Sequence, residues 1–373
     1  MTKSRVQENN KLPLGDGPRK MARLSTLQVM RAVAVNLVIL YHLTQFESVY
    51  AGKSILPAFC VYGMSGVDIF FVLSGFIMVA VAGKDIGAIQ FLWRRAIRIY
   101  PPYWLVTLII LEFSRVGAAA ATDTISLWRS FLLVPDSGLP LLTVGWTLVH
   151  EVYFYLVFAA LLALRIPISI GLLGWGLVVL IVAIVGGDYV TSFPIGRVWT
   201  HPLTAEFIMG AAIGVLYNHI KMPGAGYVGA LGLATFACSI LFLAPTLQLD
   251  KSVHLDAWRV VVFGIPAALI IYWLAAWEQK TPRMPPRLVI ALGDWSYATY
   301  LTHVLVLSAL GHIIRALALS GAMSNLALIV VGFLGANLLG ALMFRFFERP
   351  MLEALRRVRS TALARPGHTK VGG

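Results

Sequence analysis

Long apolar segments separated by short polar ones recur along almost the whole chain. A helix that crosses a bilayer needs about 20 mostly apolar residues. Windows of this kind occupy residues 27–45, 64–82, 99–116, 144–164, 168–186, 200–218, 227–245, 258–277, 288–310 and 324–346. Uninterrupted runs such as 171–185 lack the alternation of apolar and polar residues that membrane β-barrel strands have. The pattern therefore predicts an all-α polytopic membrane protein with about ten transmembrane helices.

The composition agrees and excludes a soluble globular enzyme, because 58% of the 373 residues are hydrophobic and only 13% are charged. Enrichment of Lys and Arg in cytoplasmic loops explains the net charge of +13, so nucleic acid is not an expected partner. With both termini cytoplasmic, the inner segments hold roughly three times as many Lys and Arg residues as the outer ones. We therefore expect a basic cytoplasmic tail at 1–23, a transmembrane domain at 24–350 and a second basic cytoplasmic tail at 351–373.

Ionisable side chains inside the windows are the first candidates for function, since such groups are costly in a bilayer and usually face a cavity or a partner. They are Arg31, His42, Asp68, His150, Glu151, Glu206, His303 and Arg345. One face of the first helix presents both Arg31 and His42, with an axial offset of about 16 Å and His42 nearer the outer side. Buried structural pairing is the alternative role for each group.

Three arginines, Arg94, Arg95 and Arg98, stand at the cytoplasmic end of the third window. Pro101 and Pro102 follow, and they predict a short interfacial turn before the span. Arginine presents a planar fork of donors that fits phosphate, so the cluster is suited to clamp a phosphorylated ligand that arrives from the cytoplasm. The alternative is a simple positively charged anchor.

Polar groups also repeat at helical spacing in later windows. Glu151 lies one turn from Thr147 and one turn from Tyr155, in the predicted outer half of the fourth helix. Ser296, Tyr300 and His303 share one face of the ninth helix and reach the same half, and such a stripe faces protein rather than lipid. Glu348 lies among arginines at the inner end of the tenth helix. A structural ion pair and a direct contact with a ligand are both compatible with this position.

In the second window Asp68 and Gly75 are seven residues apart, and therefore lie on nearly the same face. Gly75 permits a close backbone approach, so a helix-packing stripe is the alternative to a functional one.

The sequence has no HExxH and no GxxxxGK[ST] motif, and Ser74 lies in no GxSxG turn. His150 and Glu151 are neighbours, but adjacent helical residues point about 100° apart, which suits joint ligation poorly. Cys60 and Cys238 are too few for a disulfide framework. We expect no metal and no bound cofactor.

Six motifs occur in one order along the chain: R-x10-H at Arg31 and His42, the stretch GVDIFFVLSGF, RxxR before IYPPYW, WTLxxExxFY, SYxxYLxH and ExP. This set resembles the acyltransferase-3 family of bacterial integral-membrane O-acyltransferases, over roughly residues 24 to 350. Thr147 stands where the family often has Ser, and a hydroxyl group is retained. The extracytoplasmic SGNH-type hydrolase domain of some members is missing, which resembles the stand-alone kind that includes exopolysaccharide acetylases.

The resemblance implies a ten-helix core in the bacterial cytoplasmic (inner) membrane. It also implies transfer of an acyl group, most often acetyl, from cytoplasmic acyl-CoA as co-substrate to a hydroxyl of a cell-surface, exported or lipid-linked glycan, or of a secondary metabolite. A transporter of an anionic solute and a nonenzymatic member of a glycan export assembly are the alternatives from other classes. The oligomeric state is left open.

On this hypothesis His42 is the general base toward the acceptor hydroxyl, because imidazole takes up and returns protons near neutral pH. Glu151 is the first choice for orienting His42, and Asp68 the second. The remaining expected roles fall into two groups. Acyl-CoA binding is assigned to Arg31, Arg94, Arg95, Arg98 and Glu348, and the acceptor side to Trp146, Tyr155, Ser296, Tyr300 and His303.

Overall fold

The computed structural model describes residues 25–52, 54–81, 86–116, 126–247, 257–280, 285–319 and 321–355. No β-strand occurs in these ranges. Nine helical segments within them are long and apolar enough, by length and composition, to cross a bilayer. The prediction of an all-α polytopic membrane protein is therefore confirmed. The expected tail at 1–23 and the part of the expected tail beyond residue 355 lie outside the described residues.

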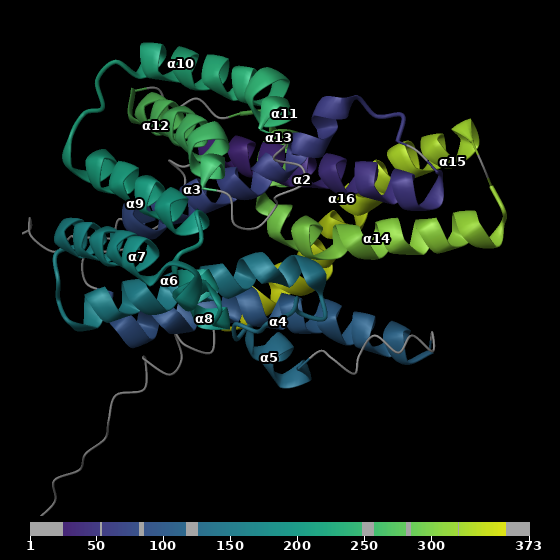
Figure 1. The fold of residues 1–373 in the computed structure, drawn as a ribbon, viewed down its shortest axis with the longest axis horizontal. Coiled ribbons are helices and arrows are strands. Elements are labelled where there is room, and N and C mark those ends of the chain that lie inside the picture. Colours follow the sequence, from purple (N-terminus) through teal and green to yellow (C-terminus); the bar gives the residue numbers. More distant parts are fainter. Residues whose placement is uncertain are drawn as a thin grey trace, which may run out of the picture.

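Figure 1 shows the α-helices of the described ranges in chain order by colour. They are α2 (Ser25–Tyr50), α3 (Ser65–Val81), α4 (Ala88–Val116), α5 (Leu127–Leu132), α6 (Trp146–Ala163), α7 (Ile168–Thr191), α8 (Pro194–Trp199), α9 (Leu203–His219), α10 (Ala225–Cys238), α11 (Ala244–Thr246), α12 (Ile265–Lys280), α13 (Arg287–Asp294), α14 (Ser296–Ala316), α15 (Ala322–Leu326) and α16 (Phe333–Met343). A π-helical segment, Ser239–Leu243, joins α10 to α11, and another, Ala327–Gly332, joins α15 to α16.

Three of the expected boundaries differ from the structure. The sixth window, 200–218, corresponds to α9, which at 17 residues is among the shortest helices that can cross a bilayer. The ninth window, 288–310, was wrong at its start, because the non-helical backbone of Trp295 separates α13 from α14. The interfacial turn before the third span was also wrong. Helix α4 runs through both prolines, since a residue before proline is biased against helix but not excluded from it.

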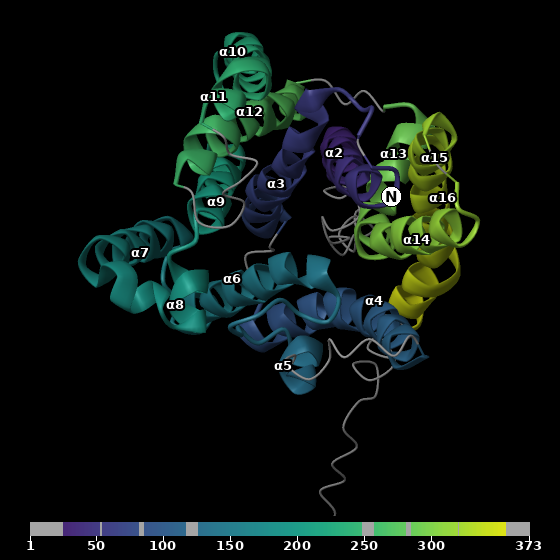
Figure 2. The same cartoon turned by 45° about the vertical axis from the view of Figure 1, so that its right-hand side comes forward.

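Helices α2 and α3 lie in the middle of the molecule (Figure 2). The group α9, α10 and α12 flanks them on one side, α13, α14 and α16 on the other, and α4 and α6 cross below both. The principal packed pairs are α3 with α9, α10 with α12, and α14 with α16. Five helices, α2, α3, α4, α6 and α14, therefore meet around the centre and position the side chains described below.

Helices α2 and α14 run in the same direction. Near the start of both, Arg31 Nε donates a hydrogen bond to Ser296 Oγ at 3.2 Å, and further along both, His303 Nε2 lies 3.3 Å from His42 Nδ1. The first and ninth expected spans thus cross the membrane in the same direction. This is required of two odd-numbered spans when successive spans alternate in direction.

The closest helix packing occurs where glycine replaces a side chain. A Cβ atom added at Gly75 of α3 would lie 2.0 Å from the carbonyl oxygen of Phe207, and one at Gly210 of α9 would lie 1.8 Å from that of Val72. The backbones of α3 and α9 are therefore in direct contact, as small residues allow at membrane helix interfaces. The close approach expected at Gly75 is confirmed.

Replacing Gly75 with alanine is expected to lower stability by about 1 to 3 kcal/mol, because the added methyl group must push α9 away from α3. Thermal unfolding of purified protein in detergent would measure this. Gly174→Ala is the matched control, since no atom lies within 4 Å of its added Cβ. Equal unfolding temperatures for the two variants would contradict the packing argument.

Candidate functional site

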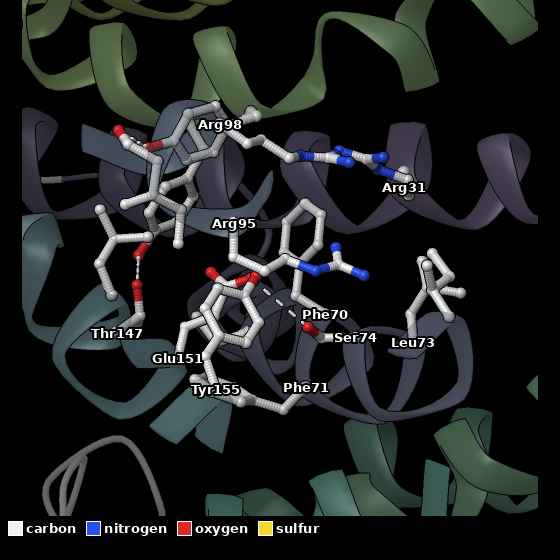
Figure 3. Close-up of a pocket in the computed structure, with 16 residues that line it drawn as sticks. Arg31, Phe70, Phe71, Leu73, Ser74, Arg95, Arg98, Thr147, Glu151 and Tyr155 are labelled. Atoms are coloured by element: carbon white, nitrogen blue, oxygen red, sulfur yellow. Dashed lines mark hydrogen bonds between the residues drawn. The ribbon is translucent and has the colours of Figure 1, made fainter. Parts of the chain in front are cut away.

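A cavity of about 110 Å³ lies where α2, α3, α4, α6 and α14 meet (Figure 3). Its polar lining consists of Arg31, Ser74, Arg95, Arg98, Thr147, Glu151, Tyr155, Tyr297 and Tyr300. The guanidinium groups of the three arginines turn toward the same side of the space. We call it the arginine-lined cavity, and it unites Arg31 of the first helix with the cluster expected at the third.

Two arginines of this cavity, Arg31 and Arg95, are held by different contacts. Arg31 donates to Ser296, as described above, and its charge also interacts with that of Arg98. The guanidinium carbon of Arg95 lies 5.5 Å from the ring centroids of both Phe91 and Tyr155, a cation–π arrangement on two faces. Arg94 is exposed and is not among the residues that line the cavity. The structure therefore separates Arg94 from the other three.

Two carboxylates accompany these arginines. Glu151 accepts hydrogen bonds from Tyr155 and from Ser74, the latter at 3.4 Å. Glu348, which is 3% exposed, interacts electrostatically with Arg98 and Arg31. Glu151 and Tyr155 thus belong to the arginine-lined cavity, and Ser296 contacts Arg31. The sequence had predicted Tyr155 and Ser296 on the acceptor side.

His42 lines a second cavity of about 190 Å³, here called the histidine cavity. Its other lining residues are Val38, Tyr41, Met64, Val67, Leu139, Thr143, Val144, Trp146, Arg259 and Tyr300. Val67 and Tyr300 line both cavities, so a shared wall separates the arginines from His42. The stripe of Arg31 and His42 on α2 therefore runs from one cavity to the next.

The hydrogen bonds of His42 identify its neutral tautomer. Nδ1 of His42 lies 2.9 Å from the carbonyl oxygen of Val38, which can only accept, so Nδ1 carries the proton and Nε2 keeps its lone pair. In the same way, Nδ1 of His303 lies 2.7 Å from the carbonyl oxygen of Tyr300, which leaves the lone pair of His303 on Nε2. That lone pair faces Nδ1 of His42 at 3.3 Å.

Neither carboxylate expected beside His42 contacts it in the described part of the chain. Asp68 instead forms a buried ion pair with Arg259, whose Nε and Nη2 lie 3.0 and 2.6 Å from the two carboxylate oxygens. Both side chains are at most 1% exposed. Arg259 was not among the residues predicted from the sequence. It lies just inside the window at 258–277 and could have been counted with the ionisable residues of the other windows.

The shared wall is itself hydrogen-bonded. Tyr300 donates to the carbonyl oxygen of Val144 at 3.0 Å, and its hydroxyl lies 2.9 Å from that of Thr147. Tyr297, which sequence reasoning also missed, donates to the carbonyl oxygen of Ile99 and so ties α14 to α4. Its place beside Ser296 in the polar stripe was the available indication.

Comparison with known proteins gives consistent matches. A family model described as an acyltransferase domain, that of the acyltransferase-3 family, matches residues 24–345. Exopolysaccharide production protein ExoZ of Rhizobium meliloti (strain 1021) is 30% identical over 317 residues, covering 80% of this chain and 93% of that protein. Acyltransferase MdmB of Streptomyces mycarofaciens is 26% identical over 387 residues, covering 93% and 96%. No solved structure matches the chain.

Asp68→Asn is expected to lower the free energy of unfolding by about 3 to 5 kcal/mol, because it removes the carboxylate charge that binds Nε and Nη2 of the buried Arg259 guanidinium. Chemical denaturation in detergent would measure the change. The double variant Asp68→Leu, Arg259→Met is the control, and it should recover much of the loss since both buried charges are gone. A single variant as stable as the unmodified protein would refute the structural role of this pair.

Proposed function

The chain belongs to the acyltransferase-3 family and is a multi-pass membrane enzyme that transfers acyl groups, and from this premise we propose its donor, acceptor and base. The proposed reaction moves an acyl group, by default acetyl, from cytoplasmic acyl-CoA to a hydroxyl group of a cell-surface or exported glycan. The proposed location is the bacterial cytoplasmic membrane. The name of the ExoZ relative, which refers to exopolysaccharide production, supports a glycan acceptor.

One observation carries the proposal: the arginine-lined cavity and the histidine cavity share Val67 and Tyr300 as a wall. A donor whose phosphates are held by arginines needs its thioester to reach a base some distance away. The axial offset of about 16 Å between Arg31 and His42 is of the order that a pantetheine arm spans. The two cavities thus supply a charged site and a reactive site in series.

Acyl-CoA is proposed to bind with its phosphates at Arg31, Arg95 and Arg98. Guanidinium groups bind phosphate through paired, charge-assisted hydrogen bonds, which are stronger than neutral ones. Glu151 and Glu348 are proposed to hold these arginines in place between donors, since each has arginines among its charged neighbours. Arg94 contributes less, because its side chain is exposed outside the cavity.

His42 is proposed as the general base. Its Nε2 lone pair takes the proton of the acceptor hydroxyl while the hydroxyl oxygen attacks the thioester carbonyl carbon. The tetrahedral intermediate then expels the CoA thiolate, and the proton returns from Nε2 to sulfur, which releases CoA as a thiol. No covalent acyl-enzyme is needed, and the products are the ester and CoA.

His303 is proposed to position His42. Its Nε2 lone pair lies 3.3 Å from Nδ1 of His42, so it can share the Nδ1 proton with the carbonyl oxygen of Val38 and hold the ring with Nε2 directed away. This neutral partner takes the place of the carboxylate expected from the sequence. Trp146 and Tyr300 line the same cavity and are the nearest candidates for the donor that stabilises the developing oxyanion.

His42→Ala is expected to lower kcat by at least about 100-fold, since the loss of a general base typically costs two to four orders of magnitude. The assay is transfer of labelled acetyl from acetyl-CoA to a crude glycan extract in membranes, followed by mass spectrometry. His312→Ala is the control, because His312 lies on α14 but is exposed. Full transfer by the His42 variant would refute the mechanism. Solute flux that needs no acyl donor would identify a transporter instead.

Arg98→Ala is expected to raise KM for acetyl-CoA about 10- to 100-fold with a smaller change in kcat, because one charged hydrogen bond is worth about 1.5 to 3 kcal/mol. Arg94→Ala is the matched comparison from the same helix and should change KM far less. Equal effects of the two variants would show that the positive charge of this end of α4, and not the cavity, binds the donor.

A further inference from the structure

A third cavity, of about 330 Å³, lies beside the histidine cavity and is more spacious than the other two. The connection that follows α5, the short helix α8 and the first turns of α6 enclose it, and Figure 2 shows α8 against α6. Its polar lining consists of Ser126, Arg129, Ser130, Asp136, Ser137, Trp146, His150, Arg197 and His201. The donor chemistry proposed above uses none of these residues except Trp146.

The third cavity adjoins the cavity that contains His42. Leu139 and Trp146 line both, so these two side chains form the boundary between the third cavity and the cavity that holds the proposed base. It shares no lining residue with the arginine-lined cavity, although neighbouring residues of α6 line the two. An acceptor that reaches the histidine cavity past Leu139 and Trp146 would therefore come from the third cavity and not from the arginine-lined one.

The charges of this cavity favour an anion. Asp136 is its acidic residue, and that carboxylate accepts a hydrogen bond from Arg129 Nη1 at 3.0 Å. Arg197 is half-buried, and it has no hydrogen bond or ion pair to any described residue. One guanidinium fork thus faces the space with its donors available, a geometry that suits a carboxylate or a phosphate.

Three aromatic rings also line this cavity and form what we call its aromatic wall. The rings of His150 and His201 are 4.5 Å apart between centroids, and Trp146 lies 5.8 and 5.9 Å from them. Nδ1 of His201 accepts the backbone N–H of Leu203 at 3.3 Å, so the neutral ring carries its proton on Nε2 as a donor. Aromatic faces pack on the C–H faces of sugars, and imidazole N–H groups donate to hydroxyls.

We propose that the third cavity is the acceptor site and that it selects a glycan bearing an anionic group, a sugar carboxylate or phosphate, which Arg197 binds. The aromatic wall holds the sugar ring that presents its hydroxyl to His42. This inference deepens the proposed acyl transfer and rests on it. A single available arginine fits one anionic group better than the several phosphates of acyl-CoA, which distinguishes this cavity from the donor site.

Direct binding tests the site without relying on turnover. The probes are a galacturonate trisaccharide, its carboxyl-reduced neutral counterpart and galactose 6-phosphate, titrated calorimetrically into the full-length protein in nanodiscs. We expect one or both anionic probes to bind at least tenfold more tightly than the neutral one, and the tighter of the two identifies carboxylate or phosphate. Arg197→Ala should abolish the preference, and Arg197→Lys should retain part of it.

Arg315→Ala is the control, because Arg315 stacks on Tyr50 at the end of α14, outside all three cavities, and should keep the preference. Equal binding of the charged and neutral probes, binding of none, or an unchanged preference in Arg197→Ala would overturn the inference.

Acetyl transfer to the same probes separates this inference from the proposed function. The expected pattern is a KM for the anionic acceptor raised at least tenfold by Arg197→Ala, with KM for acetyl-CoA unchanged. Transfer that Arg197→Ala leaves intact would refute the acceptor site and keep the enzyme. Anion binding that depends on Arg197, without transfer by any form of the protein, would instead refute the proposed function.

Discussion

The cost of placing charge in a bilayer governs the arrangement of this protein. Ionisable side chains within membrane helices must face other protein groups or a cavity, because lipid offers them neither hydrogen bonds nor counter-charges. Five helices therefore turn their polar stripes toward one centre, and Arg31, Arg98 and Glu151 meet there although three different helices present them. The same constraint pairs Asp68 with Arg259 and excludes both from solvent.

The contact between α3 and α9 makes this convergence possible. Gly75 and Gly210 bring the two backbones together, so α3 can carry Ser74 toward Glu151 on one side while Asp68 meets Arg259 on another. Asp68 is held in that ion pair, and the imidazole of His42 has a second imidazole, that of His303, as a side-chain partner. A neutral pair keeps the reactive centre free of an additional buried charge, which low-dielectric surroundings would penalise.

The sequence indicated which helices carry most of the candidate residues, but it indicated few of the contacts between those residues. The stripe of Arg31 and His42 and the arginines of α4 were recognisable because helical periodicity is a local property. The turn predicted at Pro101 is wrong because the bias of a residue before proline against helix is only a preference, and the break at Trp295 is not visible in an apolar window. Arg259 was overlooked because it stands at the edge of its window.

The sequence by itself determined the class of the protein, its helices and the residue types of its chemistry, since hydrophobicity and spacing act within one segment. Only the tertiary structure decided the partners. His42 meets His303 across 261 positions, and Asp68 meets Arg259 across 191. Such pairings depend on which helix faces pack together, and the same stripe of residues is compatible with several neighbours. The division of the interior into cavities follows from that packing, because side chains from helices distant in sequence form each wall.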